Sequence, residues 1–367
     1  MSLKPVIALI TPESLASEGL TKTVEPWEDG QRLEPVRGTF EWWYFIANLE
    51  DGSTAVLAFS TKPPIERGGP LKPLVQINIT RPDKTQLHSL RTFPAEQYHA
   101  SREVCDLRIG ENWAKGDLTT YRLHLAAPGL GADLTFTSLV GAWRPGAGRL
   151  CYGDEAHFFA WLPAQPYATV TGTLTYDGAA HAVQGTGYHD HNWGNIAMNT
   201  VLNHWYWGRA RLGGYTIIAA DLVAEKAYGN VRLPLFMIAK DGKILADDAM
   251  HVQVTRGGTH IHPQTGKFID DVLTYDEPAA DGGSYTVVFE RKRDIVYTSL
   301  LTLLPPVTEF FAHLAGANPT YLRIQGDVTL TVRGAAGETT LKSTGLWEQM
   351  FFGSNTEATI NDIRPTP

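Results

Sequence analysis

The feature that most constrains the fold of this chain is a series of short, strand-like segments rich in apolar residues, each closed by turn residues. The first such segment lies at 40–49 and ends at Glu50-Asp51-Gly52, and 54–60 is its predicted hairpin partner. Further strands are predicted at 74–80, 118–126, 132–139, 167–176, 180–185, 205–212, 215–223, 233–240, 243–245, 251–256, 284–292, 321–332 and 334–341. This spacing predicts a mainly β protein of antiparallel barrels or sandwiches, without βαβ units.

The length of 367 residues predicts two domains, since a domain averages roughly 150 residues. We expect residues 1–37 to be an irregular lead-in, 38–198 to form one β domain and 199–367 a second. The stretch at 295–314 differs from the strands, because its apolar residues have mixed spacing and Pro305-Pro306 interrupts them. It predicts a helical insert in the second domain.

Composition and missing motifs exclude several classes of function. The net charge of -8 argues against a nucleic-acid partner, and no apolar run reaches the ~20 residues that span a bilayer. We therefore expect a cytoplasmic protein without stable membrane insertion. Cys105 and Cys151 are too few for a disulfide scaffold or a CxxC zinc site, and we expect buried free thiols. Nucleotide-binding and hydrolase motifs are missing from the sequence, so no cofactor is expected. No metal is expected either, because no third ligand stands at a convincing spacing from His189 and His191.

Three segments concentrate functional side chains, and the first reads Phe-Glu-Trp-Trp-Tyr-Phe at 40–45. On a strand, Glu41 and Trp43 share one face, while Trp42 and Tyr44 share the other. An acid among aromatic rings is partly desolvated, which raises its pKa. The alternative is a structural carboxylate that pairs with an arginine.

The second segment is the densest and reads Gly-Tyr-His-Asp-His-Asn-Trp-Gly. On a strand, Tyr188, Asp190 and Asn192 point to one face, and His189 and His191 point to the other. Two chemistries compete here: the two histidines could bind a metal, or the tyrosine and aspartate could act as a proton donor and its partner. A third interpretation is structural, with polar side chains that satisfy backbone groups.

The third segment, 203–211, holds a run of aromatic side chains followed by two arginines. His204 and Tyr206 lie on one face of the predicted strand, and Trp205 lies on the other with Trp207. Aromatic faces suit an apolar or cationic guest, although tryptophan–arginine stacking across a strand is an alternative explanation.

Together the three segments resemble the hydroxyneurosporene synthase (carotenoid 1,2-hydratase) superfamily, through residues 41–44, 187–194 and 204–208. The resemblance implies two lipocalin-like β-barrel domains. It also implies kinship with carotenoid hydratases and with natural-product enzymes that catalyse Diels–Alder or acid-promoted cyclisations. Tyr188 and Asp190 match the Tyr-x-Asp pair that protonates an alkene in such hydratases, and Glu41 and Trp43 match a recurrent motif.

These observations favour a cofactor-free enzyme that hydrates or cyclises a lipophilic isoprenoid or polyketide by acid catalysis, with Asp190 as the acid. A pericyclase that folds a linear polyene is the second hypothesis, and a lipocalin-like carrier of an apolar ligand is the third. We expect a large apolar pocket close to Tyr188–Trp193. The candidate catalytic residues are Asp190, Tyr188, Glu41, His189 and His191. The candidate substrate-binding residues are Trp43, Trp193, Trp205, Tyr206, His204 and Asn192.

Overall fold

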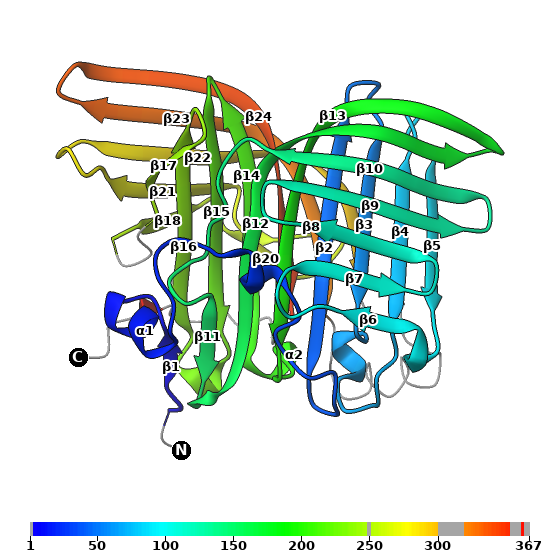
Figure 1. Cartoon of the computed structure of the whole chain (residues 1–367). Coiled ribbons are helices and arrows are strands. Elements are labelled where there is room, and N and C mark those ends of the chain that lie inside the picture. Colours follow the sequence, from blue (N-terminus) through cyan, green and yellow to red (C-terminus); the bar gives the residue numbers. More distant parts are fainter. Residues whose placement is uncertain (1–2, 248–250, 300–318, 353–360, 363–367) are drawn as a thin grey trace. The chain divides into compact units, whose positions relative to one another are not determined.

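The computed structural model describes residues 3–247, 251–299, 319–352 and 361–362. The chain divides into two compact units, which we call the N-terminal and the C-terminal unit. The N-terminal unit comprises residues 9–150 and 157–197, and the C-terminal unit comprises the described parts of 1–8, 151–156 and 198–367. Each unit is built mainly from one antiparallel sheet (Figure 1).

The sheet of the N-terminal unit has the strand order β5-β4-β3-β2-β13-β12-β10-β9-β8-β7-β6. Its strands are β2 (Phe40–Leu49), β3 (Thr54–Ser60), β4 (Leu74–Thr80), β5 (Gln86–Thr92), β6 (Tyr98–Ala100), β7 (Cys105–Ile109), β8 (Asn112–Gly116), β9 (Thr120–Ala127), β10 (Leu130–Ser138), β12 (Asp154–Tyr176) and β13 (Ala179–Gly194). Strands β7–β10 cross strands β2–β5 (Figure 1), and β10 contacts both β4 and β5. The sheet therefore curls over itself.

Alternation along each strand places the core inside this curl. In β9, Tyr121, Leu123 and Leu125 are buried, while the intervening Arg122 is exposed. The same alternation buries Phe136 on β10. Burial of these side chains stabilises the sheet through the hydrophobic effect.

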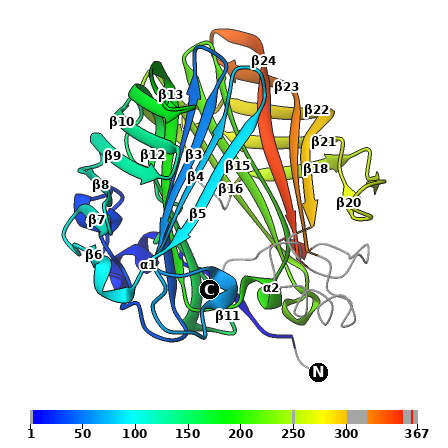
Figure 2. The ribbon, with the colours of Figure 1, turned by 90° about the vertical axis from the view of Figure 1, so that its right-hand side faces the viewer.

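The sheet of the C-terminal unit has the strand order β17-β16-β15-β14-β24-β23-β22-β21-β18, and β25 pairs in parallel with β16. Its strands are β14 (Leu202–Leu212), β15 (Tyr215–Ala224), β16 (Val231–Lys240), β17 (Lys243–Ala246), β18 (Gln253–Gly257), β21 (Val272–Pro278), β22 (Ser284–Ser299), β23 (Thr320–Gly334), β24 (Gly337–Phe351) and β25 (Asn361–Asp362). One core cluster joins residues of β14, β15, β16, β21, β22, β23 and β24, so this sheet also curls around its own core (Figure 2).

Short elements complete the described chain. They are the paired strands β1 (Val6–Ala8) and β11 (Arg149–Tyr152), the paired strands β19 (His260–Ile261) and β20 (Phe268–Ile269), the helices α1 (Pro12–Ser17) and α2 (Met198–Val201), and the 3-10 turns η1 (Pro26–Asp29), η2 (Pro64–Glu66), η3 (Ala95–Gln97) and η4 (Lys226–Tyr228). Among the described residues, no helix has both the length and the apolar character needed to cross a membrane. Neither Cys105 nor Cys151 forms a disulfide, and both are buried, as expected.

Two expectations from the sequence need correction. Residues 295–299 are not helical but form the end of β22, because they continue the pairing with β23; the rest of the predicted insert, 300–314, lies outside the described residues. The lead-in at 1–37 is not wholly irregular, since it contains β1, α1 and η1. The predicted domain bounds at 38–198 and 199–367 stay a prediction.

Candidate active site

Strand β13 carries the second motif and pairs with β2 on one side and β12 on the other. On the β2 side, Asp190 lies opposite Tyr44 and His191 lies opposite Trp43. Because side chains alternate along a strand, β13 presents two different sets of polar groups on its two faces. The predicted division of the motif between two faces is confirmed by the hydrogen bonds described below.

On one face, three side chains hold the carboxyl group of Asp190. Its Oδ2 accepts hydrogen bonds from Trp161 Nε1 at 2.9 Å and from the Tyr188 hydroxyl at 2.7 Å. Its Oδ1 accepts a hydrogen bond from Asn192 Nδ2 at 2.8 Å. Tyr188 and Asn192 were predicted to share this face. Trp161, which comes from β12, completes the arrangement.

Burial sets the acidity of Asp190. The side chain is removed from water, and burial raises the pKa of Asp190 above its ordinary value. The hydrogen bonds from Trp161, Tyr188 and Asn192 act in the opposite direction, as does the charge of His189. Among the described residues, no lysine or arginine forms an ion pair with this carboxyl group. Asp190 is thus an acid held by neutral donors.

Aromatic side chains surround this face of the sheet. Trp42 and Tyr44 lie opposite Asn192 and Asp190 in the β2–β13 register, and both are only partly buried. The ring of Trp161 meets the ring of Trp143 edge to face at 5.5 Å. The large apolar pocket expected close to Tyr188–Trp193 stays a prediction.

On the opposite face, both histidines meet carboxylates in the core. His189 Nε2 lies 3.0 Å from Asp29 Oδ2, and its Nδ1 lies 3.0 Å from the backbone oxygen of Tyr44. His191 Nε2 lies 2.8 Å from Glu41 Oε1, and its Nδ1 lies 3.4 Å from Asp29 Oδ1. The imidazoles of His189 and His191 and both carboxylates are almost fully buried.

The candidate residues of the first motif belong to this histidine face. Glu41 also accepts hydrogen bonds from the backbone amides of Arg32 at 2.6 Å and Leu33 at 3.1 Å, so it pairs with His191 and the backbone rather than with an arginine side chain. The ring of Trp43 stacks on His191 at 4.4 Å, and its Nε1 donates to the backbone oxygen of Asp29.

Trp193 also belongs to the histidine face, with its ring 4.8 Å from that of His191. The structure therefore does not bring Trp43 and Trp193 to the carboxyl group of Asp190. The period of two along β2 and β13 places them on the other side of the sheet.

The third motif forms a separate polar cluster in the C-terminal unit. His204 Nε2 lies 2.9 Å from Arg256 Nη1, and its Nδ1 lies 2.8 Å from Asn203 Oδ1. Because arginine only donates, Nε2 accepts and Nδ1 carries the proton, so His204 is neutral. Burial, aided by the nearby Arg256, lowers the pKa of His204 well below its ordinary value.

Tyr206 shares the face of His204, and Trp205 does not. The hydroxyl of Tyr206 accepts hydrogen bonds from the backbone amide of Asp270 at 2.9 Å and from Gln349 Nε2 at 2.8 Å. Trp205 is half-buried and packs against Phe352 at 5.1 Å. Tyr206 is therefore a hydrogen-bonded core residue of this sheet.

Sequence reasoning missed two residues of the clusters on β13. Asp29 lies in a segment typical of turns, and its side-chain partners Tyr121 and His189 are 92 and 160 residues away in sequence. Trp161 lies in an apolar run, and its hydrogen bond to Asp190 depends on the pairing of β12 with β13. Of the two residues, only Trp161 could have been suspected from the sequence, because a tryptophan in an apolar run is buried and its N–H group then needs a hydrogen-bond acceptor.

Comparisons with known proteins agree with the motifs. Residues 150–261, which include the second and third motifs, match the family model for the carotenoid hydratase CrtC. The chain is 28% identical over 239 residues to the quinolone epoxide rearrangement protein penF of Penicillium thymicola, covering 56% of this chain and 61% of that protein. It is 24% identical over 205 residues to the quinolone epoxide rearrangement protein asqO of Emericella nidulans, covering 51% of this chain and 55% of that protein.

These matches span less than two thirds of each relative's length. Among solved structures, CghA with Sch210972 superposes with a TM-score of 0.61 at 15% identity, covering 89% of this chain and 91% of that one. This likeness shows the fold. The resemblance to the carotenoid 1,2-hydratase superfamily that the three motifs predict is therefore confirmed, together with the mainly β, lipocalin-like fold class.

Proposed function

We propose that this protein is an enzyme that promotes the opening and rearrangement of a lipophilic epoxide by acid catalysis, with Asp190 as the general acid. The observation that carries the proposal is the buried carboxyl group of Asp190, held by neutral donors and raised in pKa. A general acid must be protonated before it reacts, and burial favours the neutral, protonated form of a carboxyl group.

The hydrogen bonds also indicate which oxygen carries the proton. Both lone pairs of Oδ2 are used by Trp161 and Tyr188, whereas Oδ1 accepts only from Asn192. A proton on Oδ1 therefore keeps all three hydrogen bonds intact. In the proposal, this proton is transferred to the substrate, and the three donors then stabilise the carboxylate that remains.

The proposed substrate class follows from the relatives. Two proteins that match in sequence are named for quinolone epoxide rearrangement, and the family model is named for carotenoid hydration. In the proposed step, the Asp190 proton moves to the epoxide oxygen, one C–O bond breaks and a carbocation forms. A 1,2-shift and loss of a proton to the Asp190 carboxylate complete an isomerisation that needs no other reactant.

The aromatic side chains beside Asp190 suit this chemistry. In the proposal, Trp42 and Tyr44 bind the substrate instead of Trp43 and Trp193, the residues expected from the sequence. Trp42 and Tyr44 share the face of Asp190. Their π faces attract positive charge and their surfaces exclude water. A hydratase or a cation cyclase would use the same acid, Asp190, and the same aromatic rings of Trp42 and Tyr44.

Conversion of three probe compounds in D₂O tests the proposal. The probes are a quinolone epoxide, the alkene from which it derives and a linear polyene, each analysed by mass spectrometry. We expect the epoxide to be opened without deuterium on carbon. One carbon-bound deuterium in an alkene product would instead indicate a hydratase or cation cyclase.

Cyclisation of the polyene alone, without deuterium, would replace the proposal by a pericyclase. Binding of all three probes without any reaction would favour the carrier.

A further inference from the structure

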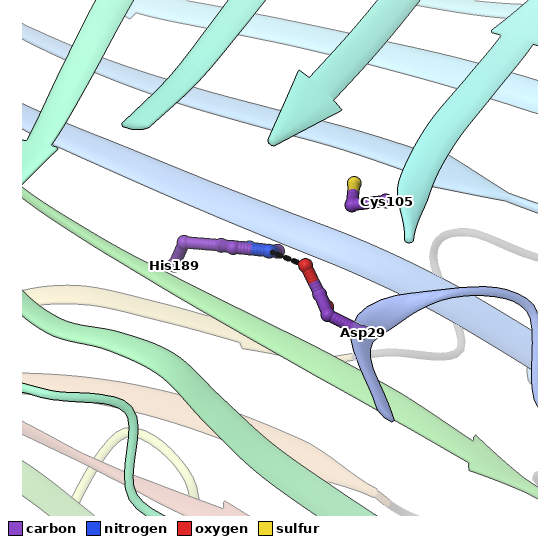
Figure 3. Close-up of side chains that lie close together, drawn as sticks. All are labelled: Asp29, Cys105 and His189. Atoms are coloured by element: carbon purple, nitrogen blue, oxygen red, sulfur yellow. Dashed lines mark hydrogen bonds and ion pairs between the residues drawn. The ribbon is translucent and has the colours of Figure 1, made fainter. Parts of the chain in front are cut away.

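We propose that Asp29, Cys105 and His189 form a binding site for one divalent transition metal ion, with Zn²⁺ as the natural occupant. Ligand atoms of the three side chains all lie within 4.8 Å of one another. Figure 3 shows the imidazole of His189 and the carboxylate of Asp29 directed toward one another, with the sulfur of Cys105 beside them. The proposal does not depend on the proposed function.

The fold brings these ligands together from three distant segments. Asp29 ends η1, Cys105 begins β7 and His189 lies on β13. The sequence argued against a metal because no third ligand stands at a suitable spacing from His189 and His191. The structure supplies the ligands that the spacing did not reveal, because the curled sheet and the preceding segment converge on one point of the core.

The orientation of His189 favours coordination through Nε2. Its Nδ1 faces the backbone oxygen of Tyr44 at 3.0 Å, and a carbonyl oxygen only accepts, so Nδ1 carries the proton. Metal-binding histidines commonly use one ring nitrogen in this way, which fixes the ring and leaves the other nitrogen for the ion. Nε2 of His189 is directed at Asp29.

Two buried polar atoms beside the cluster provide an independent observation. Within the described part of the chain, Asp29 Oδ1 and His191 Nδ1 have no hydrogen-bond partner, although both residues are fully buried. They lie 3.4 Å apart. Their ion-pair contact with each other is longer than a usual hydrogen bond, and an unsatisfied buried group is costly, so a bound ion would improve their surroundings.

The interatomic distances are compatible with one ion. Two ligands that each lie about 2.1 Å from a zinc ion are about 3.0 to 3.4 Å apart at angles between about 90° and 109°. Among the proposed ligands, Asp29 Oδ2 and His189 Nε2 are 3.0 Å apart. Asp29 Oδ2 also accepts a hydrogen bond from the Tyr121 hydroxyl at 2.5 Å, which an ion at this oxygen would displace. The Cys105 sulfur lies within 4.8 Å of the ligand atoms of Asp29 and His189.

The chemical types of the three proposed ligands indicate which metal ion would bind. A thiolate, an imidazole and a carboxylate together suit Zn²⁺ and other borderline-soft ions, whereas Mg²⁺ and Ca²⁺ prefer oxygen ligands alone. All three residues are buried, so the ion would be structural and would fasten the segment of Asp29 to the barrel core. Burial and the nearby Asp29 raise the pKa of the Cys105 thiol, so binding must displace its proton and strengthens as pH rises.

The test is metal loading of the full chain refolded in the presence of Zn²⁺ or Co²⁺. We expect elemental analysis to give one ion per chain after dialysis against a weak chelator. The Co²⁺ form should show the sulfur-to-cobalt charge-transfer band in the near ultraviolet, and its denaturation midpoint should exceed that of the metal-free protein. X-ray absorption at the zinc edge should show sulfur, nitrogen and oxygen neighbours.

Two cysteine variants provide the matched comparison. Cys105→Ser should lose the charge-transfer band, whereas Cys151→Ser, which alters the other buried free thiol, should keep it. The proposal is overturned if the wild-type chain retains no ion, or if the band survives in Cys105→Ser. If Cys105→Ser does not fold, the wild-type stoichiometry and the sulfur neighbour at the zinc edge still decide the question.

Discussion

Asp190 and Asp29 are buried aspartates on opposite faces of one sheet, yet their pKa values move in opposite directions. Burial raises the pKa of Asp190, whose partners are neutral donors. The same burial acts on Asp29, but the charges of His189 and His191, together with hydrogen bonds from His189 and Tyr121, outweigh it and lower the pKa of Asp29. The nature of the partners, rather than burial alone, therefore sets the direction in which the pKa of each aspartate moves.

Removing the Tyr188 hydroxyl should move the pH profile of catalysis. The hydrogen bond from Tyr188 lowers the pKa of Asp190, so Tyr188→Phe should raise it further. A general acid is active while protonated, and activity falls as the pH rises through its pKa. We therefore expect the alkaline fall in kcat to shift to higher pH in Tyr188→Phe.

The control is Tyr176→Phe, because Tyr176 lies at the end of β12 and stacks on His181 rather than near Asp190. Its pH profile should match that of the wild type. A fall in kcat at the same or lower pH in Tyr188→Phe would contradict the assignment of Asp190.

At the scale of elements, β13 shows what periodicity can and cannot predict. Alternation predicted correctly which side chains share a face, because the period of two is a local property of a strand. The start of β12 at Asp154 was missed, since Pro163 and Pro166 read as strand breakers. The pairing of β12 with β13 has irregularities between Leu162 and Ala168, which accommodate both prolines without ending the strand.

Adding a methyl group at Gly187 should destabilise this part of the sheet. A Cβ atom at Gly187 would lie 2.4 Å from the ring of Phe136 and 2.6 Å from Val170 Cγ2. We expect Gly187→Ala to lower the free energy of unfolding by ~1–3 kcal/mol, the usual cost of overpacking a core. Urea denaturation monitored by tryptophan fluorescence measures this change.

Gly141 provides the comparison, because it is exposed and a Cβ there meets no atom within 4 Å. Gly141→Ala should leave the free energy of unfolding within about 0.5 kcal/mol of the wild type. Equal stability of the two variants would show that Gly187 is not closely packed.

At the scale of the whole molecule, the fold class could be predicted from the sequence, but the polar clusters could not. Strand patterns and turn residues are local and repeat along the chain, so they indicated a mainly β protein. The contact of Asp29 with His189 joins residues 160 positions apart, and that of Arg256 with His204 joins residues 52 apart. Such contacts depend on how each sheet curls, which no local pattern encodes.

The neutral state of His204 predicts loss of stability in acid. His204 has a folded pKa well below the value of about 6.5 expected when unfolded. Below about pH 6.5 the unfolded chain binds a proton that the folded chain does not, so the free energy of unfolding falls as pH falls. Denaturant titrations between pH 8 and pH 5 measure the slope.

We expect His204→Gln, which keeps an acceptor for Arg256, to be less sensitive to pH in this range than the wild type. His88→Gln is the control, because His88 is exposed and its loss should leave the slope unchanged. A wild-type stability that does not vary between pH 8 and pH 5 would contradict the buried neutral state of His204.

The most direct test of the central claim is the single-turnover rate of Asp190→Asn on a substrate that the wild-type protein converts. Asparagine keeps the shape of Asp190 but carries no transferable proton, so the rate should fall at least ~10²-fold while substrate binding is retained. Asp133→Asn, which alters an exposed aspartate paired with His124, should keep the wild-type rate. A rate for Asp190→Asn within a few fold of the wild type would contradict acid catalysis by Asp190.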